Sequence, residues 1–172
     1  ASDVYKRQDL TCRTRSLLKR GSNMFPKTSI LWVNHNSERF IDVALESLQA
    51  IADLDYSNYE VIVVDNGSTD RSFDVIKNFA EKNNFKLIRS EKNLGFTGGN
   101  NLGFKARNKQ SKYVVLINND AIPYKNSLKE LIELMENEGD VGGAQGIILD
   151  FNGKVDRAGV MMDEVLTSHP LF

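Results

Sequence analysis

The chain alternates short apolar segments with amphipathic ones over most of its length. Four apolar segments, rich in β-branched or aromatic residues, predict strands at residues 29–33, 60–64, 85–88 and 113–117. After each of them, apolar residues recur every three or four positions, which predicts a helix. This repeated strand–helix order predicts an α/β fold with a mostly parallel sheet, right-handed crossovers and helices on both faces.

Shorter signals mark the ends of the later elements. Ser127, followed by Glu130 at the spacing of a capping box, predicts the start of the fourth helix. Residues 141–149 predict a fifth strand region that several glycines loosen. Asn152-Gly153 predicts a tight hairpin turn after it. The hairpin departs from the strand–helix order, so we expect the sheet to become mixed near its end.

Polar residues follow every predicted strand. They form the segments Val33–Ser37, Asp65–Asp70, Asn93–Gly103 and Asn118–Asp120. In an open parallel sheet, ligands bind outside the carboxyl ends of the strands. We therefore expect these loops to converge on one crevice, and we expect the crevice to bind a molecule rich in hydrogen-bonding groups.

The third of these loops is rich in glycine. Gly95, Gly98 and Gly99 remove side chains where the third helix begins, and a helix N-terminus presents free N–H groups that favour anions. A diphosphate or a sugar could therefore approach the backbone closely. Close packing of the helix on the sheet is an alternative that explains the same glycines. Asn100 and Asn101 add hydrogen-bonding groups, and one of them could serve only to cap the helix.

The end of the second predicted strand carries two complementary polar side chains. Asp65 offers acceptors, and Asn66 offers one acceptor and two donors. Such a pair suits the edge of a nucleobase and the hydroxyls of a ribose. The alternative is a simple turn followed by a helix cap, because Asn-Gly-Ser is common in turns.

The order and composition of these loops resemble glycosyltransferase family 2, whose members have the nucleotide-sugar-binding fold called GT-A. The resemblance runs from about Lys27 to about Asp163. The stretch Gly-Phe-Thr-Gly-Gly-Asn-Asn-Leu-Gly is most similar to bacterial, rhamnosyltransferase-like enzymes that build surface polysaccharides. The resemblance implies a GT-A-like, Rossmann-type sandwich. It also implies an inverting transfer of a sugar from a nucleotide-diphospho-sugar to a saccharide or lipid-linked acceptor.

The resemblance also implies roles for individual residues. The expected donor-binding residues are Val33, Asn34, Asn36, Asp65, Asn66, Gly95, Gly98, Gly99, Asn100, Asn101, Asn118 and Asn119.

A metal site is implied at the end of the fourth predicted strand. Asn118-Asn119-Asp120 stands where the family has its DxD-type motif, which implies Mg²⁺ or Mn²⁺ at Asp120. Such a cation neutralises the charge that develops on the departing diphosphate. Only Asp120 is ionised here, which departs from the strict motif, so we expect weak metal binding without nucleotide. An ordinary strand-ending turn is the alternative.

The catalytic base is expected elsewhere. Inverting members of the family place an acidic residue after the hairpin region, where it deprotonates the acceptor hydroxyl. No residue after the predicted hairpin matches that motif. The resemblance therefore implies an amino-terminal fragment, truncated at the C-terminus, that carries the donor-binding half while the base lies in a C-terminal part beyond it.

The first residues of the chain differ from the rest. Residues 1–23 are basic and lack periodic apolar positions, which predicts a disordered leader. Asp-Val-Tyr-Lys-Arg-Gln, residues 3–8, resembles the translated end of a sequencing adapter, so an assembly artefact is one interpretation and Met24 a plausible start. A basic arm that contacts nucleic acid or acidic lipid is another. Residues 24–172 then form the nucleotide-sugar-binding part of a GT-A domain.

Composition narrows the classes of partner. The net charge is −1, so no overall field attracts nucleic acid or an anionic membrane. The single cysteine, Cys12, cannot form an internal disulfide, which favours a cytoplasmic setting, with the inner face of the membrane also compatible. No apolar segment reaches membrane-spanning length.

Two rival functions fit part of the pattern. A dinucleotide-binding oxidoreductase would explain a glycine-rich strand-to-helix loop, but Gly95, Gly98, Gly99 and Gly103 do not fit its G-x-G-x-x-G fingerprint. A non-catalytic nucleotide-binding fragment would explain the polar loops without a base.

Overall fold

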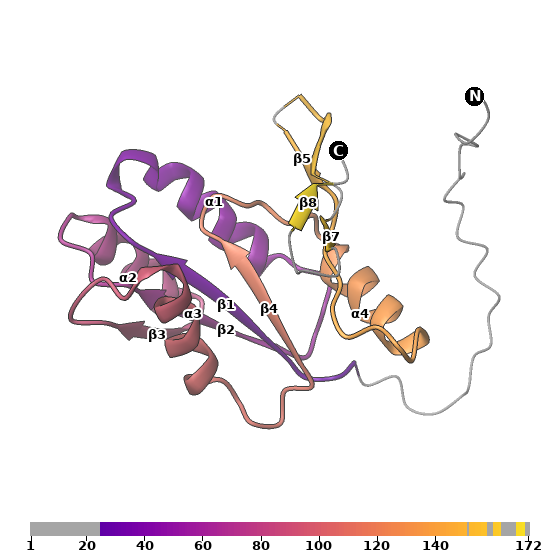
Figure 1. Ribbon diagram of the computed structural model, residues 1–172. Coiled ribbons are helices and arrows are strands. Elements are labelled where there is room, and N and C mark those ends of the chain that lie inside the picture. Colours follow the sequence, from indigo (N-terminus) through magenta and orange to yellow (C-terminus); the bar gives the residue numbers. More distant parts are fainter. Residues whose placement is uncertain (1–24, 151, 158–159, 163–167, 171–172) are drawn as a thin grey trace.

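The protein is built on one parallel sheet, which confirms the predicted fold class (Figure 1). The computed structural model describes residues 25–150, 152–157, 160–162 and 168–170. Four strands pair in the order β3-β2-β1-β4. They are β1 (Thr28–Asn34), β2 (Tyr59–Asp65), β3 (Lys86–Arg89) and β4 (Tyr113–Asn118). Because all four run in the same direction, their polar carboxyl ends meet at one edge.

Helices follow each of these strands. A short 3₁₀ turn, η1 (Glu38–Phe40), leads into α1. The helices are α1 (Ile41–Ala52), α2 (Ser72–Lys82), α3 (Gly95–Ala106) and α4 (Ser127–Asn137). Buried residues of α1, α2 and α4 belong to one hydrophobic cluster on one face of the sheet, whereas α3 packs on the other face (Figure 1).

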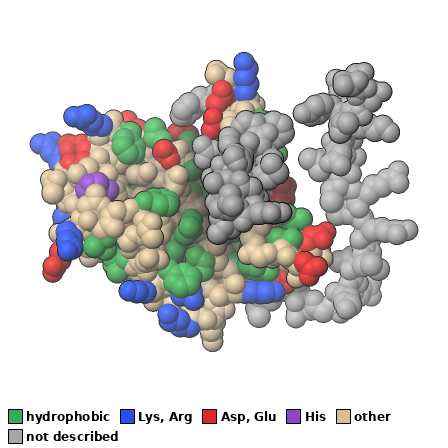
Figure 2. All heavy atoms as spheres, in the orientation of Figure 1, with side chains coloured by type: hydrophobic (Ala, Val, Ile, Leu, Met, Phe, Trp, Pro, Cys, Tyr) green, Lys and Arg blue, Asp and Glu red, His purple; other side chains and the backbone are tan. Residues whose placement is uncertain are grey.

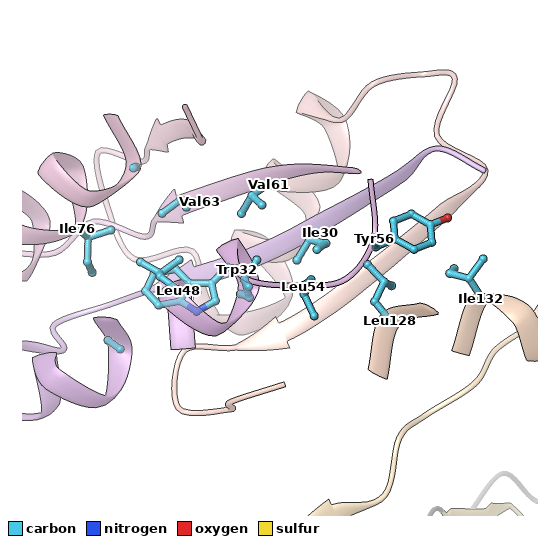
Figure 3. Close-up of a cluster of buried hydrophobic side chains, with 13 residues drawn as sticks. Ile30, Trp32, Leu48, Leu54, Tyr56, Val61, Val63, Ile76, Leu128 and Ile132 are labelled. Atoms are coloured by element: carbon cyan, nitrogen blue, oxygen red, sulfur yellow. The ribbon is translucent and has the colours of Figure 1, made fainter. Parts of the chain in front are cut away.

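Successive side chains of a strand point to opposite faces of the sheet, so each central strand contributes residues to both hydrophobic clusters. Trp32 is fully buried in the larger one, where it lies near Leu48 of α1 and Val63 of β2 (Figure 3). Its indole Nε1 donates a hydrogen bond to Ser47 Oγ at 3.1 Å, so this large side chain is buried without an unsatisfied donor. The neighbouring Leu31 points to the opposite face, toward α3.

Glycines bring α3 unusually close to the sheet. A Cβ on Gly99 would lie 2.8 Å from Val33 Cγ1, and one on Gly103 would lie 3.2 Å from Val64 Cγ2. Both distances are too short for a comfortable side-chain contact. The close-packing interpretation therefore accounts for these two glycines, and the N-terminus of α3 is held against the ends of β1 and β2.

The C-terminal region confirms the hairpin but not the mixed sheet. Gly153 has φ +76°, and Asp150 N–H donates to the carbonyl of Lys154 at 2.8 Å. The hairpin joins β5 (Ile148–Leu149) to β6 (Val155–Arg157); a second antiparallel pair joins β7 (Val160–Met162) to β8 (Ser168–Pro170). Within the described ranges neither pair joins the four-stranded sheet. The strand predicted over 141–149 shrinks to its last residues because glycines are poor strand formers.

The start of α4 also differs from its prediction. Asn126, not Ser127, occupies the N-cap position, and its Nδ2 donates to the carboxylate of Glu130. Ser127 Oγ instead donates to the carbonyl of Tyr124 at 2.8 Å. The helix begins at the predicted place, but the cap is shifted by one residue.

Some sequence predictions lie outside the described residues. The proposed leader of residues 1–23, Met24 and Cys12 all belong to this group. In the part of the chain that the structure describes, no helix is both long and apolar enough to cross a membrane.

Candidate functional site

The polar loops converge on one open cavity at the carboxyl edge of the sheet, as the topology predicts. Its volume is about 370 Å³. The predicted site residues that line it are Val33, Asn66, Gly95, Asn100, Asn118, Asn119 and Asp120. They come from the ends of β1, β2 and β4 and from the start of α3. The cavity thus has contributions from each of the predicted loops.

Six other predicted residues are not among those that line the cavity. These are Asn34, Asn36, Asp65, Gly98, Gly99 and Asn101. Asn34 is fully buried, and its Nδ2 lies 3.1 Å from Asp65 Oδ1 and 3.0 Å from Ser68 Oγ. Its Oδ1 accepts a hydrogen bond from Ser37 Oγ. The side chain of Asn34 is therefore held in a buried network, and a direct contact with a ligand would require this network to open.

Asp65 is the charged member of that buried network. Its carboxylate is fully buried, and Oδ2 accepts a hydrogen bond from the Ser68 N–H at 3.2 Å. Arg89 Nε lies 3.4 Å from the same oxygen, and its guanidinium covers the Phe73 ring at 3.7 Å from the centroid. A buried carboxylate needs such partners. The carboxylate of Asp65 therefore stabilises the β2–α2 loop.

The first two loops are also linked to each other at the rim. Asn36, with φ +50°, accepts a hydrogen bond from the Thr69 N–H at 2.8 Å. Asp70 accepts from the N–H groups of Glu38 and Ser72, each at 3.0 Å. Desolvation raises the pKa of Asp70, but the hydrogen bonds from Ser72 and Glu38 outweigh it and hold the pKa below its ordinary value. These bonds fix the two loops relative to each other.

Asn66 links the end of β2 to the loop before α3. Its Nδ2 donates to Asn93 Oδ1 and to the Gly95 carbonyl, both at 3.0 Å, and its Oδ1 accepts from the Leu94 N–H at 3.0 Å. The residue is only 2% exposed. Hydrogen bonds from Asn66 to a nucleobase, as predicted from the sequence, would have to replace some of these bonds.

Gly95 and Gly98, the first two glycines of the loop before and at the start of α3, have different surroundings. Gly95 has φ +71°, and a Cβ there would meet nothing within 4 Å. Gly95 is therefore required by its backbone conformation, not by lack of space. A Cβ on Gly98 would instead lie 2.6 Å from Leu94 Cβ, inside the loop itself.

The end of β4 offers oxygen ligands to the cavity. Asn118 and Asp120 are exposed and Asn119 is half-buried. Among the described residues, no three His, Cys, Asp or Glu side chains form a metal-binding cluster. One carboxylate and neighbouring amide oxygens suit Mg²⁺ or Mn²⁺, but most coordination positions would have to come from a diphosphate and water. The residues fit a cation that binds together with nucleotide.

Five residues that line the cavity were not among the predicted donor-binding or metal-binding residues. They are His35, Phe40, Asn93, Phe96 and Ile117. Phe40 follows the first predicted strand at a position where helical spacing predicts a buried residue, but it belongs to η1 and is 41% exposed. Phe96 is 64% exposed. His35 and Asn93 stand inside loops already identified as polar strand ends, which was the available signal.

An apolar surface adjoins this polar edge. Figure 2 shows hydrophobic side chains on the face of the molecule where α3 and β4 lie. The exposed hydrophobic residues of α3 and β4 include Phe96, Phe104 and Leu116. Phe96 belongs to the cavity lining, so the cavity combines polar groups with an apolar wall, a combination typical of small-molecule sites.

Comparison with known proteins decides the family. Residues 29–165 match the family model described as Glycosyl transferase family 2. The chain belongs to this family. The match covers the span over which the loops resemble the family, and it removes support from the oxidoreductase alternative. Glycosyltransferases are also what the related sequences are named.

Related glycosyltransferase sequences are much longer than this chain. Poly(ribitol-phosphate) beta-N-acetylglucosaminyltransferase TarS from Staphylococcus aureus is 31% identical over 117 residues, which are 67% of this chain and 20% of TarS. Glycosyltransferase GlyA from Streptococcus pneumoniae is 30% identical over 94 residues, 55% of this chain and 13% of GlyA. The chain thus spans a small part of each relative.

Solved structures confirm the GT-A-type fold. The crystal structure of S. aureus TarS 1-349 in complex with UDP-GlcNAc matches with a TM-score of 0.56 and 25% identity, over 70% of this chain and 38% of that chain. The mannosyltransferase PcManGT from Pyrobaculum calidifontis, in complex with GDP-Man and Mn²⁺, has a TM-score of 0.57 and 23% identity, over 63% and 32% of the two chains. The second likeness concerns the fold alone.

Proposed function

We propose that this chain carries the donor-binding part of a family 2 glycosyltransferase and binds a nucleotide-diphospho-sugar in the cavity at the carboxyl edge of the sheet. The convergence of the ends of β1, β2 and β4 with the start of α3 on that cavity supports the proposal most directly. The likeness to TarS, which was crystallised with UDP-GlcNAc, adds support from a relative.

The surroundings of the cavity suit the parts of such a donor. The N-terminus of α3 presents backbone N–H groups and favours the charge of a diphosphate. Val33, Phe40, Phe96 and Ile117 provide apolar surface against which a base or sugar face can pack. Asn100 of α3 and Asn118 of β4 add hydrogen-bonding groups to the lining.

A divalent cation completes the proposed donor site. Asp120 would hold Mg²⁺ or Mn²⁺, with Asn118 and Asn119 as neutral oxygen donors beside it. When bound, the cation would neutralise the diphosphate as a leaving group. The chain's own contribution is to place one exposed carboxylate at the cavity edge, where it would otherwise repel the phosphates.

The chemistry of transfer is proposed for the whole protein. It would move the sugar, with inversion, to a saccharide or lipid-linked acceptor in surface polysaccharide synthesis, and it would act in the cytoplasm or at the inner face of the membrane. Asp120 is the one carboxylate among the described residues that line the cavity. If Asp120 holds the cation, an acidic base that deprotonates the acceptor must come from outside the residues that line the cavity.

The same observation favours one second candidate. A cavity with a single carboxylate also suits a module that binds a nucleotide without catalysing transfer. The two functions share the binding step and differ in whether sugar reaches an acceptor.

Calorimetry with a panel of ligands tests the proposal. The chain is titrated with UDP, GDP, ADP, CDP and NAD in the presence of Mg²⁺. We expect at least one nucleoside diphosphate to bind more tightly than NAD. Asn118→Ala should weaken that binding, whereas the same truncation at Asn78, on the exposed surface of α2, should not. If NAD binds more tightly than every nucleoside diphosphate, the proposal is wrong.

A further inference from the structure

Asn93 has no role among the predicted donor-binding residues, yet it lines the cavity. It stands between β3 and α3, and its side chain is exposed. Its Oδ1 accepts two hydrogen bonds, one from the Gly95 N–H at 2.8 Å and one from Asn66 Nδ2 at 3.0 Å. The acceptor end of this amide is therefore turned inward, into its own loop.

That arrangement fixes which end of the Asn93 amide is free. A backbone N–H can only donate, so the atom 2.8 Å from Gly95 N has to be the amide oxygen. The nitrogen must then be the outer end of the side chain. In the described part of the chain, Asn93 Nδ2 forms no hydrogen bond, so its two N–H groups remain available at the cavity wall.

Asn66 holds Asn93 in this orientation. Its own amide is assigned in the same way, because Leu94 N–H must face Oδ1 and the Gly95 carbonyl must face Nδ2. The remaining amide hydrogen points to Asn93 Oδ1. Only a carboxamide can supply this set of one acceptor and two donors. A carboxylate at position 66 would place acceptors against two other acceptors.

The turn after Asn66 supports the same loop by a separate contact. Gly67 has φ +72°, and a Cβ there would lie 2.4 Å from Lys92 C and 2.7 Å from Asn93 N. The backbone of the β2–α2 turn therefore lies directly against the backbone that leads into Asn93. The position of Asn93 is set by this contact, and the rotation of its amide is set by Asn66.

We propose that Asn93 contacts the nucleotide through Nδ2, by donating a hydrogen bond to a base carbonyl or phosphate oxygen, and that Asn66 is the positioning residue that orients it. This inference rests on the proposed function and adds a specificity-determining residue to it. Both kinds of acceptor are oxygens that an amide N–H recognises, and no positive charge is required. Donation from a preoriented amide costs little side-chain entropy on binding.

A conservative substitution isolates the free donor. Asn93→Asp keeps the oxygen that Gly95 and Asn66 require but removes both N–H groups. We expect it to weaken binding of the preferred nucleoside diphosphate about tenfold or more, because an acceptor of the ligand loses its donor and meets a negative charge. Asn78→Asp introduces the same charge on exposed α2 and should change affinity less than about twofold.

Ligand parts then identify the acceptor. A loss of affinity that persists with the nucleoside alone assigns the contact to the base, whereas a loss confined to inorganic pyrophosphate assigns it to phosphate. Equal affinity of the parent and Asn93→Asp for the nucleoside diphosphate would overturn this inference and leave the proposed function intact. Failure of the parent to bind any nucleoside diphosphate would overturn both.

A double-mutant cycle tests the positioning role of Asn66. Affinities are measured for Asn66→Ala, Asn93→Ala and the double variant, with circular dichroism to confirm folding. If Asn66 acts through Asn93, the double variant binds about as weakly as the weaker single variant. Independent, additive losses would show that Asn66 acts in another way. If Asn66→Ala does not fold, Asn93→Asp alone decides whether Asn93 contacts the nucleotide.

Discussion

Arg89 is the cationic partner of the buried Asp65 carboxylate, with 3.4 Å between Arg89 Nε and Asp65 Oδ2. The carboxylate side chain has no exposed surface, whereas half of the arginine side chain reaches solvent. Arg89 also donates through Nη2 to the carbonyl of Ser68 at 3.1 Å. One arginine from β3 therefore stabilises both the charge at the end of β2 and the turn that follows it.

Removing the Arg89 guanidinium should destabilise the fold. We expect Arg89→Met to lower the free energy of unfolding by about 1–3 kcal/mol, because it leaves a buried carboxylate without its cation, although Asn34 and Ser68 still donate to it. Urea denaturation measures the loss. Lys77→Met is the matched control, since the Lys77–Glu81 pair is exposed on both sides and should contribute less than about 0.5 kcal/mol. Equal losses in the two variants would contradict the role assigned to Arg89.

Two glycines with nearly the same backbone conformation should respond differently to alanine. Gly67 and Gly95 have φ +72° and +71°. Gly95→Ala should cost only the strain of a left-handed residue, about 1–2 kcal/mol. Gly67→Ala should cost clearly more, because its Cβ would lie 2.4 Å from a backbone atom of Lys92. Thermal unfolding of both variants provides the comparison, and an equal shift in Tm would show that the β2–α2 turn can move away from Lys92.

Metal dependence should follow Asp120. In the parent chain, Mg²⁺ should strengthen binding of the nucleoside diphosphate, because a cation held by Asp120 would offset the repulsion between its carboxylate and the phosphates. Asp120→Asn should remove most of that dependence and leave Tm almost unchanged, since the side chain is exposed. Asp140→Asn, an exposed carboxylate that is not among the cavity residues, should retain the dependence. If a chelator does not alter the affinity of the parent chain for the nucleoside diphosphate, the assignment of a metal to Asp120 is wrong.

Asp70 should contribute to the acid side of the stability profile. Its pKa is lowered from 3.8 in the folded chain, so the unfolded chain binds the proton more readily. The contribution is therefore complete above pH 3.8 and disappears as the pH falls through the lower, folded pKa. Asp70→Asn should reduce the difference in unfolding free energy between pH 6 and pH 3, measured with urea. Asp140→Asn supplies a control of equal charge change, and the same reduction there would show that Asp70 is not the group responsible.

The sequence predicted the sheet and the place of the site because both depend on local patterns. The apolar segment around Trp32 is short, which favours a buried strand, and parallel strands bring polar ends such as Asn118-Asn119-Asp120 to one edge. The strand prediction over residues 141–149 was too long. Apolar residues favour a strand there and the glycines oppose it, and the sequence pattern alone does not show which effect is stronger.

The sequence could not separate the polar residues that face the cavity from those that support it. Asn34 and Asn118 both follow apolar strands, yet one is buried in a network and the other is exposed at the cavity. The difference comes from partners far away in sequence, such as Ser72 for Asn34 and Asn93 for Asn66. Such partners are known only once the loops are placed in three dimensions.

The close approach of α3 to the sheet has a practical consequence. Gly99 and Gly103 place the helix against Val33 and Val64, and Val33 both lines the cavity and packs on the smaller hydrophobic cluster. A ligand that binds the folded chain and not the unfolded one raises the temperature at which the domain melts. Melting curves recorded against a library of nucleotide sugars should therefore rank candidate donors without any knowledge of the acceptor.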